Sequence, residues 1–105
     1  MSIQITGRKI EVTDFMKIYI QDIIQGLYKY HLNINTIHVI VENNKKTIKV
    51  EFIINIQGQN KFVIKSSDKD FYTATANTYE ISEKTLRRLH DKLVSQKKQT
   101  EKINF

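Results

Sequence analysis

Polar and apolar residues alternate along four segments of the chain, and this period of two predicts four β-strands. The segments are residues 2–6, 36–42, 47–56 and 61–67. The turn-forming stretches ENNKK and QGQN separate the last three segments, so we expect those strands to form a meander of two hairpins. Gly7 is expected to end the first strand, because glycine weakens a strand interior.

Between the first and second predicted strands, apolar residues recur at helical spacing, which predicts an amphipathic helix over residues 14–30. Thr13 is the expected N-cap, and Asp14 in the first turn complements the positive end of the helix dipole. Asn33 and Asn35 are expected to follow the end of the helix. The apolar positions are Met16, Ile20, Ile23, Ile24 and Leu27.

The stretch from SSDKDF to HDKLV predicts a second and longer helix. Ser67 or Asp68 is the expected N-cap, and Asp70 lies in the first turn. Steps of 100° per residue place an apolar face on one side of this helix, interrupted by Thr75 and Ser82. The apolar positions are Tyr72, Tyr79, Leu86, Leu89 and Leu93.

These elements follow in the order βαβββα, which predicts an α/β (α+β) two-layer sandwich with a four-stranded sheet and both helices on one face. The first two strands are joined through a helix and should be parallel neighbours. A chain of 105 residues has room for one domain. We place this domain at residues 1–96 and interpret residues 97–105 as a short C-terminal tail that need not be ordered.

Positive charge is concentrated late in the chain. Up to Glu83 the sequence has ten Lys or Arg residues against nine Asp or Glu, whereas from Lys84 onward it has seven against two. The last fifth of the chain therefore carries nearly all of the net charge of +6. On the predicted helix, the basic residues lie opposite the leucines, with Asp91 and Ser95 between them. They are Lys84, Arg87, Arg88, Lys92 and Lys98.

Charge alone leaves several interpretations of this helix face open. A solvated surface is the ordinary role of charged residues. Here, however, cations at spacings of three and four residues repel one another, and two adjacent arginines suit bidentate phosphate contact. An acidic membrane surface fits less well, because the other side of the helix is needed to cover the sheet. The pattern indicates a module that binds a polyanion, with docking of an acidic protein partner as the alternative.

Catalytic and metal-binding patterns are not found in the sequence. The chain contains no cysteine, and His31, His38 and His90 are dispersed without a ligand-like spacing. Helix capping explains Asp68 and Asp70 better than a catalytic carboxylate pair does. We therefore expect neither an enzyme nor a cofactor or metal site. No export signal or apolar run long enough for a bilayer is seen, so we expect a cytoplasmic protein.

The stretch ITGRKIEVTD, residues 5–14, resembles the opening signature of the ribosome hibernation-promoting factor family, also called the ribosome-associated inhibitor or light-repressed protein family. The similarity continues with Tyr19 and the Lys29–Tyr30 pair in the first helix, and with DFY at the start of the last helix. It extends over nearly all of residues 1–98. The length of the chain resembles that of the short members of the family.

This resemblance implies a fold similar to double-stranded RNA-binding domains, with no catalytic activity. It implies binding to the small ribosomal subunit, with its 16S-type rRNA, at the decoding centre. There the protein would block tRNA and mRNA and silence translation under stress or in stationary phase. A ribosome modulation factor is a candidate partner. DNA and membrane partners are not expected, and the free protein is expected to be monomeric.

The resemblance also assigns residues. Arg8 matches the Gly-Arg position of the opening motif. Four basic residues of the last helix match the family's rRNA-contacting face: Lys84, Arg87, Arg88 and Lys92. Lys29, at the end of the first helix, matches less closely. Ala76 and Ile81 depart from the family pattern, which often has Asp and Lys at these positions. The predicted rRNA-binding residues are Arg8, Lys29, Lys84, Arg87, Arg88, Lys92 and Lys98.

Overall fold

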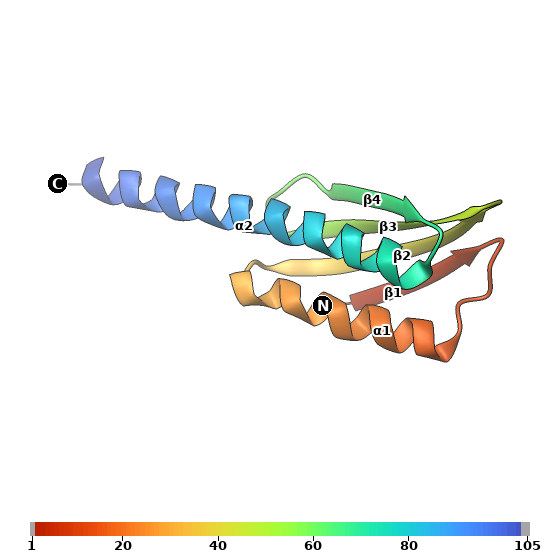
Figure 1. The fold of residues 1–105 in the computed structure, drawn as a ribbon. Helices are drawn as coiled ribbons and strands as arrows, with labels where there is room; N and C mark the ends of the chain where they lie inside the picture. Colours follow the sequence, from red (N-terminus) through yellow and green to blue (C-terminus); the bar gives the residue numbers. More distant parts are fainter. Residues whose placement is uncertain (1, 104–105) are drawn as a thin grey trace.

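The computed structural model describes the backbone of residues 2–103 and the side chains of residues 2–96. Its element order, βαβββα, is the predicted one (Figure 1). The elements are β1 (Ser2–Arg8), α1 (Asp14–Ile24), the 3₁₀ helix η1 (Gln25–Tyr30), β2 (Ile34–Asn44), β3 (Thr47–Ile56), β4 (Phe62–Asp68) and α2 (Phe71–Ile103).

The four strands form one sheet in the order β1-β2-β3-β4. β1 runs parallel to β2, while β2, β3 and β4 form the predicted antiparallel meander. The expectation that Gly7 ends the first strand is wrong, because Gly7 pairs with Val41 and the strand continues to Arg8. The glycine is needed for a different reason. A Cβ atom there would lie 2.4 Å from the carbonyl oxygen of Ile10, where the chain folds back after the strand.

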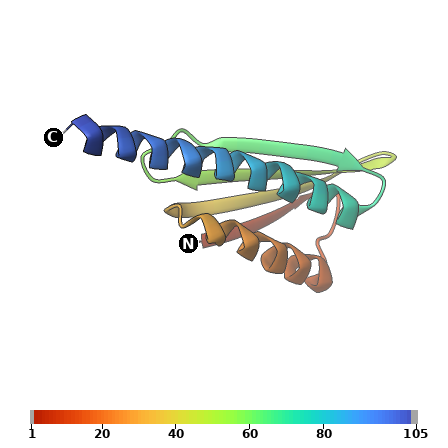
Figure 2. The same ribbon diagram turned by 60° about the vertical axis from the view of Figure 1, so that its left-hand side comes forward.

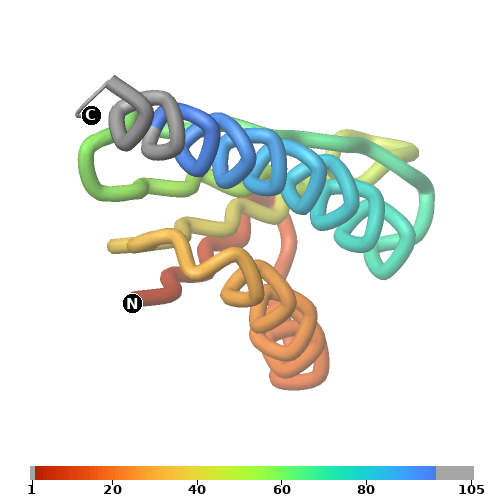
Figure 3. Tube along the Cα trace, turned by 90° about the vertical axis from the view of Figure 1, so that its left-hand side faces the viewer, coloured from red at the N-terminus to blue at the C-terminus, as the bar shows by residue number. Residues whose placement is uncertain are grey.

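Both helices cover the same face of the sheet (Figures 1 and 2). α2 packs across β3 and β4, and α1 lies beside β1 (Figures 1 and 3). The core between the two layers is formed by alternate strand residues, such as Val39 and Phe52, together with Ile20 and Ile24 of α1 and Leu86 of α2. The other face of the sheet has no helix over it and carries the intervening, mostly polar strand residues.

α1 begins as predicted, with the Thr13 side chain accepting a hydrogen bond from the backbone N–H of Met16 at 3.2 Å. The predicted α-helix over residues 14–30 is wrong in its last part. The α-helix ends at Ile24, and η1 continues to Tyr30, where His31 adopts a left-handed conformation with φ 52°. The chain therefore leaves the helix at His31, two residues before the expected exit at Asn33.

α2 begins later than predicted, because β4 extends to Asp68. Asp70, rather than Ser67 or Asp68, accepts the capping hydrogen bond from the backbone N–H of Thr73 at 2.9 Å. α2 then continues to Ile103, so the domain end expected at residue 96 falls inside this helix. Within the described part of the chain, no helix is long and apolar enough to cross a membrane.

Candidate nucleic-acid interface

The C-terminal half of α2 separates charged from apolar residues. Leu86 is fully buried and Leu89 is 9% exposed, and both pack into the core. The predicted basic residues face the other way: Lys84, Arg87, Arg88 and Lys92 are all exposed. Two expected members of the apolar face are not buried, because Tyr72 is 45% and Leu93 is 37% exposed. Phe71, Ala74 and Thr78 are buried instead, so the face that holds the helix is shifted from the predicted one.

Small hydroxyl residues, together with Phe71 and Ala74, pack the first half of α2 against the sheet. Thr75, Thr78 and Ser82 are fully buried. Each donates a hydrogen bond to the backbone carbonyl four residues earlier, at 2.8 to 2.9 Å. The Thr78 hydroxyl also lies 3.1 Å from the carbonyl oxygen of Val50 in β3. These contacts satisfy the buried hydroxyls and fix α2 on the sheet, so the basic face is part of a rigid element.

Most of the cations on this face have no acidic partner. Lys84 lies 3.6 Å from Glu80 in an exposed pair between successive turns, which contributes little stability. The Asp91 carboxylate lies 3.3 Å from the ring of His90. No ion pair to Arg87, Arg88 or Lys92 is formed within the described part of the chain. Their charges therefore remain available to an external anion.

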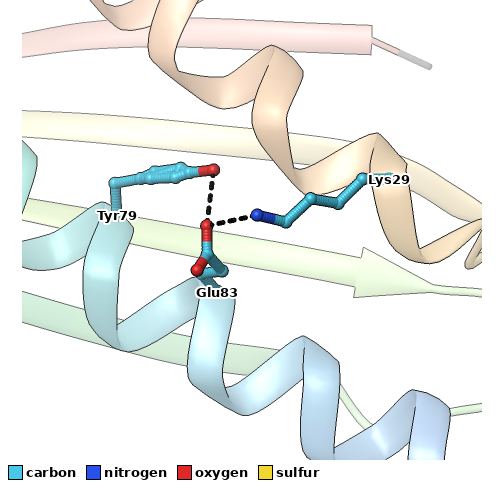
Figure 4. A network of polar contacts seen from close by, with 3 residues as sticks. All are labelled: Lys29, Tyr79 and Glu83. Carbon is cyan, nitrogen blue, oxygen red and sulfur yellow. Dashed lines mark hydrogen bonds and ion pairs between the residues drawn. The ribbon is translucent and has the colours of Figure 1, made fainter.

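Glu83 would be the natural partner of Arg87, one turn later on α2, but its carboxylate is held elsewhere. Figure 4 shows Glu83 Oε2 between two donors, Lys29 Nζ of η1 at 2.8 Å and the Tyr79 hydroxyl at 3.0 Å. Hydrogen bonds from Lys29 and then from Tyr79 lower the pKa of Glu83. The hydrogen bond to Glu83 raises the pKa of Lys29, while burial is the main reason that the pKa of Tyr79 is raised.

The structure does not bring all the predicted contact residues together. Arg8 is exposed at the end of β1, in alternation with Ile3 and Ile5, which face the core. Its side chain therefore belongs to the open face of the sheet, away from α2. Lys29 is close to α2 but is bound to Glu83, so it is not a free cation. The side chain of Lys98 lies outside the described residues.

A comparison with protein families identifies the group to which the chain is related. Residues 3–94 match the family described as sigma 54 modulation protein / S30EA ribosomal protein. The chain belongs to this family. The match includes nearly all of the sheet, α1, most of α2 and the basic residues Lys84, Arg87, Arg88 and Lys92, and it confirms the family resemblance found in the sequence.

Solved structures share the fold of this S30EA-family chain. The N-terminal domain of Protein Y from Thermus thermophilus aligns with a TM-score of 0.77 and 22% identity, over 85% of this chain and 99% of that one. A ribosomal subunit interface protein from Coxiella burnetii aligns with a TM-score of 0.74 and 19% identity, over 85% of this chain and 97% of the other. A comparison with curated proteins finds no match. The predicted α+β sandwich is thus confirmed.

Sequence reasoning missed two features of this S30EA-family surface. The first is the group of Lys29, Tyr79 and Glu83, in which Lys29 lies far from the other two residues in the sequence. The second is Lys61, which precedes β4 and borders the same surface cavity as Arg88. Nothing in the local pattern around these residues indicates the pairing, because the pairing depends on how α2 lies across the sheet.

Proposed function

We propose that this protein binds the small ribosomal subunit at the decoding centre, through rRNA contacts made by the outer face of α2. In that position it blocks tRNA and mRNA and silences translation under stress or in stationary phase. The action is steric occupation by a rigid domain in the cytoplasm and involves no catalysis. Membership of the S30EA ribosomal protein family supports this proposal.

The observation that carries the proposal is the set of cations Arg87, Arg88 and Lys92, which form no ion pair with the described side chains and lie on a helix that is fixed to the sheet. Like charges at neighbouring helical positions repel one another, so this face is destabilising until an anion neutralises it. Arginine has a planar group that contacts phosphate oxygens in pairs. A row of such groups on a rigid surface suits the phosphate backbone of a folded RNA, which proteins recognise largely by shape.

The proposal is tested by co-sedimentation of the purified protein with separated ribosomal subunits at low and at high salt. We expect binding to the small subunit alone. It should weaken with salt by a log–log slope of roughly 0.7 to 0.9 for each phosphate neutralised. Binding that persists after the RNA has been digested by nuclease would instead support docking to an acidic protein.

A second test compares charge reversal on α2 with the same charge reversal elsewhere on the surface. Arg87→Glu with Arg88→Glu should lower the affinity for the small subunit about a hundredfold or more, because attraction to phosphates becomes repulsion. The control is Lys46→Glu with Lys69→Glu, which makes the same change in net charge at exposed positions in two loops. Circular dichroism should show both proteins folded. Unchanged binding by the folded arginine variant contradicts the proposal.

A further inference from the structure

The turn between β3 and β4 and the middle of α2 together line a surface cavity of about 410 Å³. Figures 2 and 3 show this turn, in green, beside the helix. The turn contributes Gln59, Asn60 and Lys61, and α2 contributes Arg88 and Lys92. A helix face by itself offers phosphates a convex surface, whereas a cavity of this size lies in the range that accommodates a small organic ligand.

The turn is held in place from both sides. Gly58 adopts φ 79°, a conformation that favours glycine, and the backbone N–H of Gln59 donates to the carbonyl of Ile56 at 3.1 Å. The backbone N–H of Gln57 donates to the carbonyl of Asn33 at 3.0 Å, and the side chains of these two residues are also hydrogen-bonded. The wall of the cavity is therefore built into the sheet.

The lining combines three kinds of chemistry. Lys61, Arg88 and Lys92 supply positive charge, and no ion pair to them is formed among the described residues. Phe62 and Leu89 supply an apolar surface, and the amides of Gln59 and Asn60 can both donate and accept hydrogen bonds. None of the described lining residues is acidic. A nucleotide has matching parts: an anionic phosphate, a flat apolar base and a polar base edge.

We propose that this cavity binds one unpaired nucleotide of an RNA strand. Lys61, Arg88 and Lys92 surround its phosphate, and the base lies against Phe62 and Leu89. The inference rests on the proposed function and deepens it, because it adds the β3–β4 turn to the interface and makes part of the recognition specific for single-stranded RNA. A nucleotide that is paired and stacked in a helix cannot enter the cavity.

The test uses a fluorescently labelled RNA of about ten nucleotides, alone and annealed to its complement, titrated with the full chain and followed by anisotropy. We expect tighter binding of the single strand. Lys61→Glu should weaken that binding about tenfold and reduce its log–log salt slope by about 0.7. Lys46→Glu is the matched control, since Lys46 is also an exposed lysine in a hairpin turn, and it should change the affinity by less than about twofold.

Asn60→Ala tests the polar wall without a change of charge. It should weaken binding of the single strand but leave the salt slope as it is, because no phosphate contact is lost. Three results would overturn the proposal: equal losses for Lys61→Glu and Lys46→Glu, equal affinity of the wild-type protein for single strand and duplex, or no binding of the single strand at low salt.

Co-sedimentation with the small subunit distinguishes failure of this inference from failure of the proposed function. If the wild-type protein pellets with the subunit but Lys61→Glu and Lys46→Glu bind RNA equally, the function stands and the cavity proposal fails. If the protein does not pellet but discriminates between the oligonucleotides as described, the cavity proposal stands and the ribosomal function fails.

Discussion

The open face of the sheet and the outer face of α2 both carry basic residues, but more of those on the sheet have an acidic residue opposite them. Across the strands, Glu42 lies opposite Arg8 of β1 and opposite Lys49 of β3, with its carboxylate 3.5 Å from the Lys49 amine. In the same way Lys65 of β4 lies opposite Glu51. On α2, by contrast, Arg87, Arg88 and Lys92 form no ion pair within the described part of the chain, and Lys84 has only its exposed pair with Glu80.

This difference separates charges that support the fold from charges that are available for binding. Opposite charges on neighbouring strands stabilise a sheet and leave little net field outside it. Unpaired cations on one helix face repel one another and produce a field that attracts polyanions. Arg8 lies opposite Glu42 on the sheet, and its assignment as an rRNA contact stays a prediction.

The largest effect should come from reversing charges on the two faces separately. Arg87→Glu with Arg88→Glu is expected to abolish most binding to the small subunit while leaving the free energy of unfolding nearly unchanged. Lys49→Glu with Lys65→Glu should do the opposite. It should lower the free energy of unfolding by about 1–2 kcal/mol, because the Lys49–Glu42 ion pair is lost and like charges then stand opposite each other at both positions, and leave binding within about twofold.

The measurement is urea denaturation and co-sedimentation of four proteins. They are the wild type, the two variants and their combination. Because the two faces share no contacts, the effects on stability should add in the combined variant. A loss of subunit binding in the folded sheet-face variant would show that the paired cations also contact rRNA, and the distinction between the two faces would fail.

Periodicity in the sequence was enough to predict every strand and both helices, because each element alternates apolar and polar residues at its own period. The boundaries were less predictable. Asp68 and Asp70 both suit an N-cap, and the choice depends on β4, which extends to Asp68 by pairing with Ile48. Thr75 and Ser82 look like interruptions of an apolar face, yet they are buried, because their hydroxyls bond to the helix backbone.

The candidate site was predictable where it depends on one helix and unpredictable where it depends on tertiary packing. Helical spacing alone places Arg87, Arg88 and Lys92 on one side of α2. The pairing of Lys29 with Glu83 joins residues that are 54 positions apart in the sequence, and Lys61 reaches the same region through the β3–β4 turn. A local pattern contains no information about either contact. The sequence alone therefore could not distinguish Arg87, Arg88 and Lys92 from Lys29, which is paired with Glu83.

The next largest effect should be on the contact that anchors η1 to α2. A Cβ atom on Gly26 would lie 2.0 Å from the Tyr79 hydroxyl oxygen, so Gly26→Ala requires the tyrosine to move away from Glu83. We expect the free energy of unfolding to fall by about 1–3 kcal/mol, measured by urea denaturation. Gln25→Ala, at the exposed neighbouring position, should change it by less than about 0.5 kcal/mol. A more stable Gly26→Ala protein would show that helix propensity outweighs the clash.

A smaller effect should follow when only one hydrogen bond to Glu83 is removed. Tyr79→Phe should lower the free energy of unfolding by about 0.5–1.5 kcal/mol. It should also weaken subunit binding about twofold, because Glu83, then held by Lys29 alone, can pair more often with Arg87 one turn away. Adding Glu83→Gln removes the competing charge and should restore the affinity without restoring the stability. If the double variant binds as weakly as Tyr79→Phe alone, Glu83 does not compete with RNA for Arg87.

The smallest effect should be on the pH dependence of stability. Hydrogen bonds from Lys29 and Tyr79 hold the pKa of Glu83 below its ordinary value of 4.5 in the folded protein. A carboxyl group with a lowered folded pKa contributes stability above its unfolded pKa, and that contribution is lost as the pH falls through the folded value.

The difference in unfolding free energy between the wild type and Glu83→Gln should therefore be constant near neutral pH and should shrink below about pH 4.5. Urea denaturation across that interval measures it, and Glu80→Gln, which removes only the exposed pair with Lys84, controls for a general loss of negative charge. A difference that stayed constant down to pH 3 or grew on acidification would mean that the Glu83 carboxylate is not held by these donors in solution. These hydrogen bonds would then not explain why Arg87 forms no ion pair with Glu83.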